Sequence, residues 1–296
     1  MQRARLDSGI ELDYIDCGPC DAHTLIFLHG FPESHRAWRN QVSYFSDRFR
    51  CIAPDQRGYC GSSKPQSISD YTIDKLTKDV FELAQALGLE SFTVVGHDWG
   101  GAVAYGVAMQ GQASGKIANL ITINAPTPYK FQKLLWLDPA QREASQYMRE
   151  FCNSANDEII RTNGLGELLL NSVKWLRHDK LEVSERNRQL LQWQDGNAAI
   201  SMLNWYRAAS VVVPPMDAPF ALPIDWVEPI LPTITIPTLV IWGMEDNSLL
   251  SSNLDGLSDI TTDLTIHKVL NHSHFLPWED PDTINNVMAS FLAKLF

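Results

Sequence analysis

The chain has 296 residues, of which 45% are hydrophobic and 20% are charged. This is the composition of a soluble globular protein, long enough for one large α/β domain with an insertion. Its 24 Lys and Arg residues stand against 35 Asp and Glu residues, a formal net charge of −11, so neither nucleic acid nor an anionic membrane is expected as a partner. The sequence opens without an apolar signal segment and contains no apolar run of transmembrane length. We expect a cytoplasmic protein, and a monomer or a homodimer.

Short apolar runs recur along the chain, of the kind that form buried parallel strands. Segments with helical periodicity lie between several of them; one is Ile73 to Leu87, followed by Gly88 where a helix-ending glycine is favoured. The alternation predicts a doubly wound α/β fold. The expected strands are Glu11 to Asp16, Thr24 to Leu28, Cys51 to Ala53, Ser91 to Val95, Leu120 to Ile123, Thr238 to Trp242 and Leu264 to Val269.

The alternation stops near residue 127, where strand-like runs give way to amphipathic helical stretches. We interpret 127–226 as a helical cap inserted into an α/β core formed by 1–126 and 227–296. A proline-dense stretch leads back to the sheet, with Pro214, Pro215, Pro219, Pro223, Pro229, Pro232 and Pro237. Core and cap are expected to meet over the carboxyl ends of the strands, where open α/β sheets bind their ligands.

The five cysteines are odd in number and irregularly spaced, which argues against a disulfide framework. Cys17-Gly18-Pro19-Cys20 spells a CxxC dithiol. A redox pair of this kind lies at the N-terminus of a helix, whereas this one lies between two strand-like runs. We interpret it as a Gly-Pro turn, with a redox site as the alternative.

The most specific motif is Gly96-His97-Asp98-Trp99-Gly100, at a strand-to-helix junction. It has the form of a nucleophile elbow, in which small residues allow a tight turn that exposes the central side chain. Asp98 stands where many such enzymes have serine, so we predict a carboxylate nucleophile. The structural alternative is an aspartate that caps the following helix.

An acid and a histidine are expected after the nucleophile, each in a loop that follows a strand. Asp246 and His274 meet this requirement, and we predict that Asp246 orients His274 as the base. Their neighbours Glu245 and His272 are the alternatives. His29 and His97 are expected to hold loops through backbone hydrogen bonds. The oxyanion hole requires main-chain N–H groups, which we assign to Trp99 and to Phe31 in His29-Gly30-Phe31-Pro32.

These segments, together with Asp55-Gln56-Arg57-Gly58-Tyr59, resemble the epoxide hydrolase branch of the α/β-hydrolase superfamily. The resemblance implies a mostly parallel eight-stranded sheet flanked by helices, with an inserted helical cap. It also implies two cap tyrosines that donate hydrogen bonds to the ring oxygen of an epoxide. Tyr206, in Leu203-Asn204-Trp205-Tyr206-Arg207, matches the family's segment, and Tyr147 matches its spacing from the nucleophile more than its flanking residues. Either could instead be an aromatic residue of the cap core.

A carboxylate that attacks an ester carbonyl gives an anhydride, whereas attack on a saturated carbon gives an ester that water can cleave. Epoxides, haloalkanes and halo acids are therefore the candidate substrates. Haloalkane dehalogenases of this superfamily hold the halide between the Trp after the nucleophile, present here as Trp99, and an Asn where this chain has Phe31. Haloacetate dehalogenases have an Arg where this chain has Trp99, so an epoxide is the better match. We expect hydrolysis to a vicinal diol through an alkyl ester on Asp98, with a small-molecule epoxide and water as partners and without metal or organic cofactor.

A haloalkane or haloacid dehalogenase is the alternative enzyme, and a non-catalytic binding protein is the alternative from another class. Substrate shape is expected to be set by side chains of the cap near the nucleophile. The candidate substrate-binding residues are Trp205, Trp136, Phe151 and Met202.

Overall fold

The computed structural model describes residues 1–173, 176 and 181–296. Its centre is an eight-stranded sheet with the strand order β1-β2-β4-β3-β5-β6-β7-β8. Strands β3 to β8 are parallel to one another, whereas β2 is antiparallel to both of its neighbours, β1 and β4. The strands are β1 (Gln2–Arg5), β2 (Glu11–Cys17), β3 (Thr24–Leu28), β4 (Arg50–Pro54), β5 (Phe92–His97), β6 (Ile117–Ile123), β7 (Thr238–Gly243) and β8 (Leu264–Val269).

The predicted α/β-hydrolase fold is confirmed, and each of the seven expected strands coincides with an observed one. The eighth strand, β1, was not among the predicted runs, because its sequence QRAR is charged and mostly exposed. It is held at the edge of the sheet by pairing with β2 and by an ion pair of Arg3 with Asp13. Local apolar patterning therefore could not reveal it.

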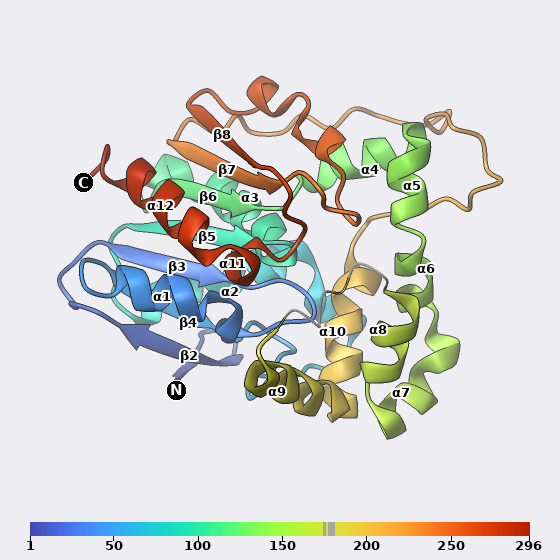
Figure 1. The fold of residues 1–296 in the computed structure, drawn as a ribbon, viewed down its shortest axis with the longest axis horizontal. Coiled ribbons are helices and arrows are strands. Elements are labelled where there is room, and N and C mark those ends of the chain that lie inside the picture. The colour runs from blue at the N-terminus through green and yellow to red at the C-terminus, as the bar shows by residue number, and fades with distance from the viewer. Residues whose placement is uncertain (174–175, 177–180) are drawn as a thin grey trace.

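Helices cover both faces of the sheet (Figure 1). On one face, α2 and α3 pack over a large apolar cluster, and on the other face α1 and α12 pack over a second one. Helix α2 ends at Ala86, and Gly88 follows with φ of +66°, as its sequence predicts. These helices are α1 (Arg39–Phe45), α2 (Ile73–Ala86), α3 (Trp99–Gly111), α11 (Leu276–Glu279) and α12 (Pro281–Leu292).

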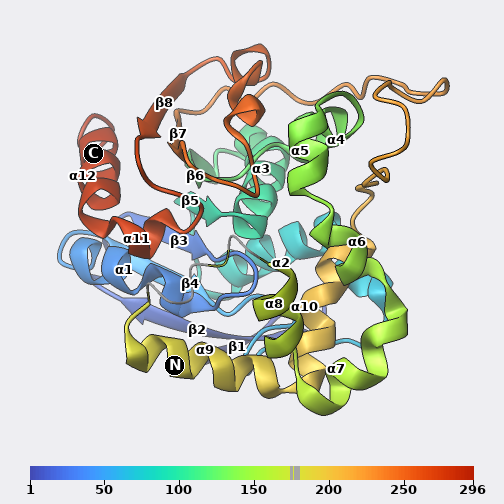
Figure 2. The ribbon, with the colours of Figure 1, turned by 45° about the vertical axis from the view of Figure 1, so that its right-hand side comes forward.

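Between β6 and β7 the described residues form a helical insertion, made of α4 to α10, which lies beside one end of the sheet (Figures 1 and 2). After α10 the chain returns to β7 through residues 209–237, here named the strap, which contains no helix and no strand longer than an isolated bridge. The insertion consists of α4 (Pro128–Leu137), α5 (Pro139–Ala144), α6 (Tyr147–Cys152), α7 (Asp157–Asn163), α8 (Gly166–Ser172), α9 (Val183–Gln194) and α10 (Gly196–Ala208).

The Cys17 to Cys20 segment is a turn between β2 and β3, as interpreted from the sequence, and it does not open a helix. Gly18 adopts φ of +98° in this turn, and Cys17 and Cys20 are exposed free thiols. None of the helices in the described part of the chain is both long enough and apolar enough to cross a membrane.

Candidate active site

Asp98 lies in a sharp turn between β5 and α3, with φ of +51° and ψ of −122°. A side-chain carbon at Gly96 would come within 2.3 Å of the carbonyl oxygen of Gly100, and one at Gly100 would come within 2.1 Å of the carbonyl oxygen of Leu28. Only glycine fits at both positions, which is the steric requirement of a nucleophile elbow. The strained turn places the Asp98 carboxylate at the head of α3.

Main-chain donors hold this carboxylate. The Phe31 N–H donates to Asp98 Oδ1 at 2.7 Å, and the Trp99 N–H also donates to the carboxylate. Burial by itself raises the pKa of Asp98, but the hydrogen bond and charge of His274, the charge of His97 and the Trp99 N–H together lower it below its ordinary value. The two N–H groups assigned from the sequence therefore converge on Asp98, which is an anion ready for nucleophilic attack.

His274 lies between two carboxylates. Its Nδ1 is 2.7 Å from Asp246 Oδ2, and its Nε2 is 3.5 Å from Asp98 Oδ2. Burial alone lowers the pKa of His274, but the two carboxylates outweigh it and raise the pKa well above its ordinary value. The structure thus brings Asp98, Asp246 and His274 together, and the two carboxylates favour the protonated form of the histidine.

Asp246 is fixed by four hydrogen-bond donors. The N–H groups of Ser248 and Leu249 donate to Oδ1, at 2.8 and 2.9 Å, while His274 and the Asn124 side chain share Oδ2. Asn124 donates at 2.7 Å and accepts from the Gly243 N–H at 3.0 Å, so it ties the loops after β6 and β7 together. The sequence reasoning missed Asn124. The feature of the sequence that could have indicated it is its position, as an asparagine directly after a buried strand. In the structure Asn124 has φ of +42°, a conformation that asparagine tolerates.

The other histidines of this region act on loops, as predicted. His29 contacts the carbonyl oxygen of Gly30 and accepts from the Gln56 N–H, and His97 Nε2 is 2.8 Å from the carbonyl oxygen of His274.

Neither alternative triad member enters the site. The Glu245 side chain is exposed. His272 contacts the carbonyl oxygen of Leu270 and the carboxylate of Asp280.

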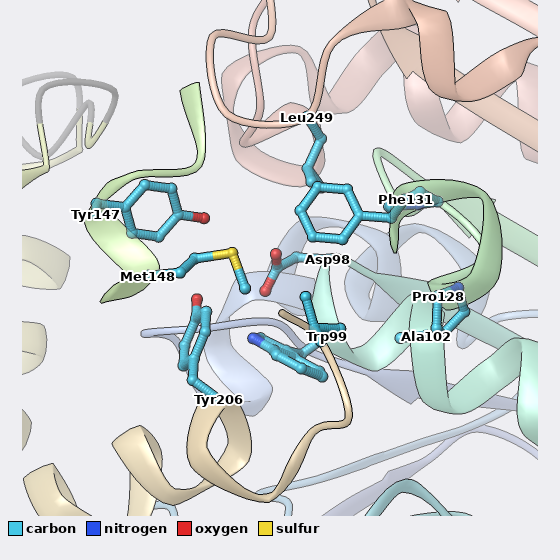
Figure 3. A pocket seen from close by; sticks show the side chains of 11 residues that line it. Asp98, Trp99, Ala102, Pro128, Phe131, Tyr147, Met148, Tyr206 and Leu249 are labelled. Carbon is cyan, nitrogen blue, oxygen red and sulfur yellow. The ribbon is translucent and has the colours of Figure 1, made fainter. Parts of the chain in front are cut away.

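Two tyrosines of the insertion face Asp98. Tyr147 and Tyr206 line the same cavity as Asp98, and their hydroxyl groups point toward its centre (Figure 3). The Tyr147 hydroxyl lies 3.1 Å from Ser248 Oγ and is also hydrogen-bonded to Tyr206, while the Trp99 side chain bonds to the Tyr206 hydroxyl. Burial first, and the negative charge of Asp98 in addition, raise the pKa of both phenols. Both hydroxyl groups therefore keep their protons and can act as donors.

Comparisons with known proteins agree on one family. A family model described as the alpha/beta hydrolase fold matches residues 23–281. Epoxide hydrolase 1 of Caenorhabditis elegans is 30% identical over 294 residues, which cover 96% of this chain and 68% of that protein. The AB hydrolase superfamily protein YfhM of Bacillus subtilis is 32% identical, with 96% and 95% of the two chains covered.

Solved structures give the same result. One reported among novel epoxide hydrolases in metagenomes from hot environments is 55% identical, with a TM-score of 0.96 and 98% and 97% of the two chains covered. An inhibitor complex of a Bacillus megaterium epoxide hydrolase is 29% identical, with a TM-score of 0.84 and 99% and 100% covered. The chain belongs to the epoxide hydrolase branch of the α/β-hydrolase superfamily. Membership of this family makes it a hydrolase.

The cavity over Asp98, here named the catalytic cavity, has a volume of about 50 Å³. Apart from Asp98, Trp99 and the two tyrosines, its walls are apolar, and most of the side chains that form them were not predicted from the sequence. These residues are Ala102, Pro126, Pro128, Phe131, Met148, Val211 and Leu249.

The four substrate-binding candidates chosen from the sequence are not among the side chains that line this cavity. Trp205 donates its indole N–H to the carbonyl oxygen of Arg57 at 2.9 Å, between the insertion and the core. Phe151 packs behind the wall, with its ring 5.1 Å from Tyr206 and 5.2 Å from Tyr147. Met202 is fully buried in the core, and Trp136 is half-buried near the end of α4.

Proposed function

We propose that this protein hydrolyses epoxides to vicinal diols through a covalent alkyl ester on Asp98. The observation that carries the proposal is the pairing, in one cavity, of an anionic aspartate held by two main-chain N–H groups with two protonated tyrosine hydroxyls. An epoxide needs both a nucleophile for its ring carbon and a hydrogen-bond donor for its ring oxygen. The relatives named epoxide hydrolases support the same activity.

In the first step, the Asp98 oxygen that faces His274 attacks a ring carbon, and the carbon–oxygen bond of the ring breaks. The electron pair moves to the ring oxygen, which accepts hydrogen bonds from Tyr147 and Tyr206. Over the whole step, one proton passes from His274 to the ring oxygen. The product hydroxyl forms, Asp98 becomes a neutral ester, and His274 becomes a neutral imidazole.

In the second step, the neutral His274 removes a proton from water, and the resulting hydroxide attacks the carboxyl carbon of Asp98. The N–H groups of Phe31 and Trp99 already hold the carboxylate, so they are placed to stabilise the oxyanion of the tetrahedral intermediate. Asp246 orients the imidazole and balances its charge. When the intermediate collapses, the second diol oxygen leaves with the proton from His274, and Asp98 remains as a carboxylic acid. Transfer of the Asp98 proton to His274 then restores the starting carboxylate and the imidazolium.

The residues 127–226 act in this proposal as a cap, because they bring the two phenols to a nucleophile supplied by the core. A dehalogenase is the alternative that uses the same aspartate, and Trp99, which lines the cavity, is the residue that this chain shares with haloalkane dehalogenases. The tyrosine hydroxyls are suited to an alkoxide, which must gain a proton.

The test is a panel of alkyl and aryl epoxides, with haloalkanes and haloacetates beside them, scored for diol and for halide. We expect diol from epoxides, and we expect Asp98→Asn to reduce its formation by about 10⁴-fold or more, as the loss of a nucleophile does. Halide release without any diol would contradict the proposal and favour the dehalogenase. Diol formation that persists in freshly prepared Asp98→Asn would contradict the role of Asp98.

A further inference from the structure

The catalytic cavity is too small for most epoxides. Its volume of about 50 Å³ compares with roughly 30 Å³ for one liquid water molecule and with about 300 to 1,000 Å³ for typical ligand pockets. The cavity accommodates an epoxide ring and little more. Any sizeable substituent on the ring must therefore lie outside it.

A second cavity adjoins it, with a volume of about 520 Å³. Helices α2, α3 and α4 form one side of this cavity, and strap residues between 210 and 232 form the other, so we name it the strap chamber. Ala102, Pro128 and Val211 line both cavities, which are therefore separated by no more than one layer of side chains. In Figure 3, Ala102 and Pro128 lie on the side of Asp98 away from the two phenol oxygens. A ring whose oxygen faces the tyrosines thus has its opposite side toward the chamber.

The wall of the strap chamber is mostly apolar but contains two buried polar atoms without partners. The Tyr129 hydroxyl and the Thr77 hydroxyl are both buried, and neither has a hydrogen-bond partner among the described residues. The Tyr129 ring stacks on Trp226 of the strap, with 6.1 Å between ring centroids and 27° between ring planes. Buried donors without partners cost about 1 to 3 kcal/mol each. Both oxygens are shielded from the open space of the chamber, so the surface offered to an occupant is mainly apolar.

The outer wall of the chamber is anchored at both ends. Toward its start, the strap is held by the fully buried Arg142, which donates to five carbonyl oxygens, three of them in the strap, and stacks on Phe220 at 3.9 Å. Gln132 pairs with both the N–H and the carbonyl oxygen of Val212. Toward its end, Gln112 bonds to residues Thr233 and Thr235. The strap therefore forms a fixed wall of the chamber, although it has no regular secondary structure.

We propose that the strap chamber binds the larger substituent of an epoxide whose ring lies in the catalytic cavity. The occupant is an extended apolar chain or aryl group. This inference rests on the proposed function, which it deepens by naming the substrate class. It also gives the proline-rich strap a role in substrate binding.

The test uses Met109→Trp on the full-length protein, because Met109 lines the strap chamber and not the catalytic cavity. The volume-conserving Met109→Leu is the matched control. The substrates are 1,2-epoxybutane, whose substituent is short, and 1,2-epoxydecane, whose chain must extend into the chamber. We expect Met109→Trp to lower kcat/KM for 1,2-epoxydecane at least tenfold and to leave 1,2-epoxybutane within twofold, whereas Met109→Leu changes neither by more than twofold.

An equal effect of Met109→Trp on both substrates, or no effect on either, would overturn the chamber proposal while the proposed function stands. Absence of diol from both epoxides with the wild-type protein would instead overturn the proposed function, and the chamber proposal with it.

Discussion

The two sides of the catalytic cavity are held in place by different forces. On the core side, Asp98, Asp246 and His274 follow strands β5, β7 and β8, and the carboxylates accept hydrogen bonds from main-chain N–H groups. On the insertion side, Tyr147 and Tyr206 lie on short helices, and ring packing against Phe151 and Phe31 holds them. The sheet thus fixes the atoms that react. The insertion fixes the groups that hold the leaving oxygen and the substituent.

The comparison predicts that changes on the core side affect the hydrolysis of the alkyl ester, while changes on the insertion side affect its formation. The largest effect is expected for His274→Gln, which removes the base of the second step. Asp98 can still attack, and water then supplies the proton that the ring oxygen gains from His274 in the wild type. Hydrolysis of the ester should slow by about 10²- to 10⁴-fold, the usual contribution of a general base. Intact-mass spectrometry after mixing with an epoxide should show the enzyme plus one substrate. An unmodified mass together with normal turnover would remove His274 from the mechanism.

On the insertion side, Tyr206→Phe and Tyr147→Phe each remove one donor to the ring oxygen. Hydrogen bonds to a charged group contribute about 1.5 to 3 kcal/mol, so each variant should slow ester formation by about ten- to a hundredfold, and the double variant by more. Stopped-flow measurement of the single-turnover phases separates formation from hydrolysis. Tyr14→Phe, which loses a phenol bonded to Gln2 far from the site, is the matched control. A slower hydrolysis phase with unchanged formation would contradict this division of roles.

A smaller effect is expected for Asn124→Ala, which removes a donor from Asp246 and an acceptor from the Gly243 N–H. Because Asn124 acts through Asp246, ester hydrolysis should fall by about tenfold, near the lower end of the effect of a hydrogen bond to a charged group. Asn124→Gly, which tolerates the positive φ, controls for backbone strain. The measurement is the rate of ester hydrolysis as a function of pH. A less well oriented Asp246 should lower the pKa of His274, so the pH profile should shift to lower pH. An unchanged profile would indicate a purely structural role for Asn124.

The smallest predicted effect concerns the pKa of His274 itself. Although burial lowers it, Asp246 and Asp98 together raise this pKa well above the ordinary value. Alkylation of Asp98 removes one of these two charges. The pKa of His274 should therefore be lower in the ester intermediate than in the free enzyme, and ester hydrolysis should rise with pH through this lower value. NMR titration of the His274 ring in wild type and in Asp98→Asn, a neutral stand-in for the ester, measures the shift. Identical titration curves would contradict it.

The core side of the site could be predicted from sequence because it follows from strand ends. A buried strand has a length and an apolar pattern that can be recognised, and the residue after it lies at the sheet edge where ligands bind. Asp98, Asp246 and His274 all meet that description. Asn124 also meets it, but its role depends on a contact across to β7 that strand patterns do not specify.

The insertion side could be predicted only in part, because its helices are buried on more than one face. Every residue of α10 from Ala198 to Tyr206 is buried, so helical periodicity does not distinguish the face toward the cavity from the faces toward the core. Trp205 and Met202 were chosen from such a pattern and pack elsewhere. The residues that do form the wall, such as Val211 and Leu249, lie in irregular segments whose course depends on tertiary contacts.

The central claim, that Asp98 itself forms and loses a covalent ester, is tested most directly by a single turnover in ¹⁸O-labelled water. One epoxide equivalent is reacted with excess enzyme, and the Asp98 peptide and the diol are then analysed by mass spectrometry. The account predicts that one ¹⁸O atom enters the Asp98 carboxylate and that the diol remains unlabelled. Label in the diol, with none in Asp98, would show direct attack of water on the epoxide and would contradict the account.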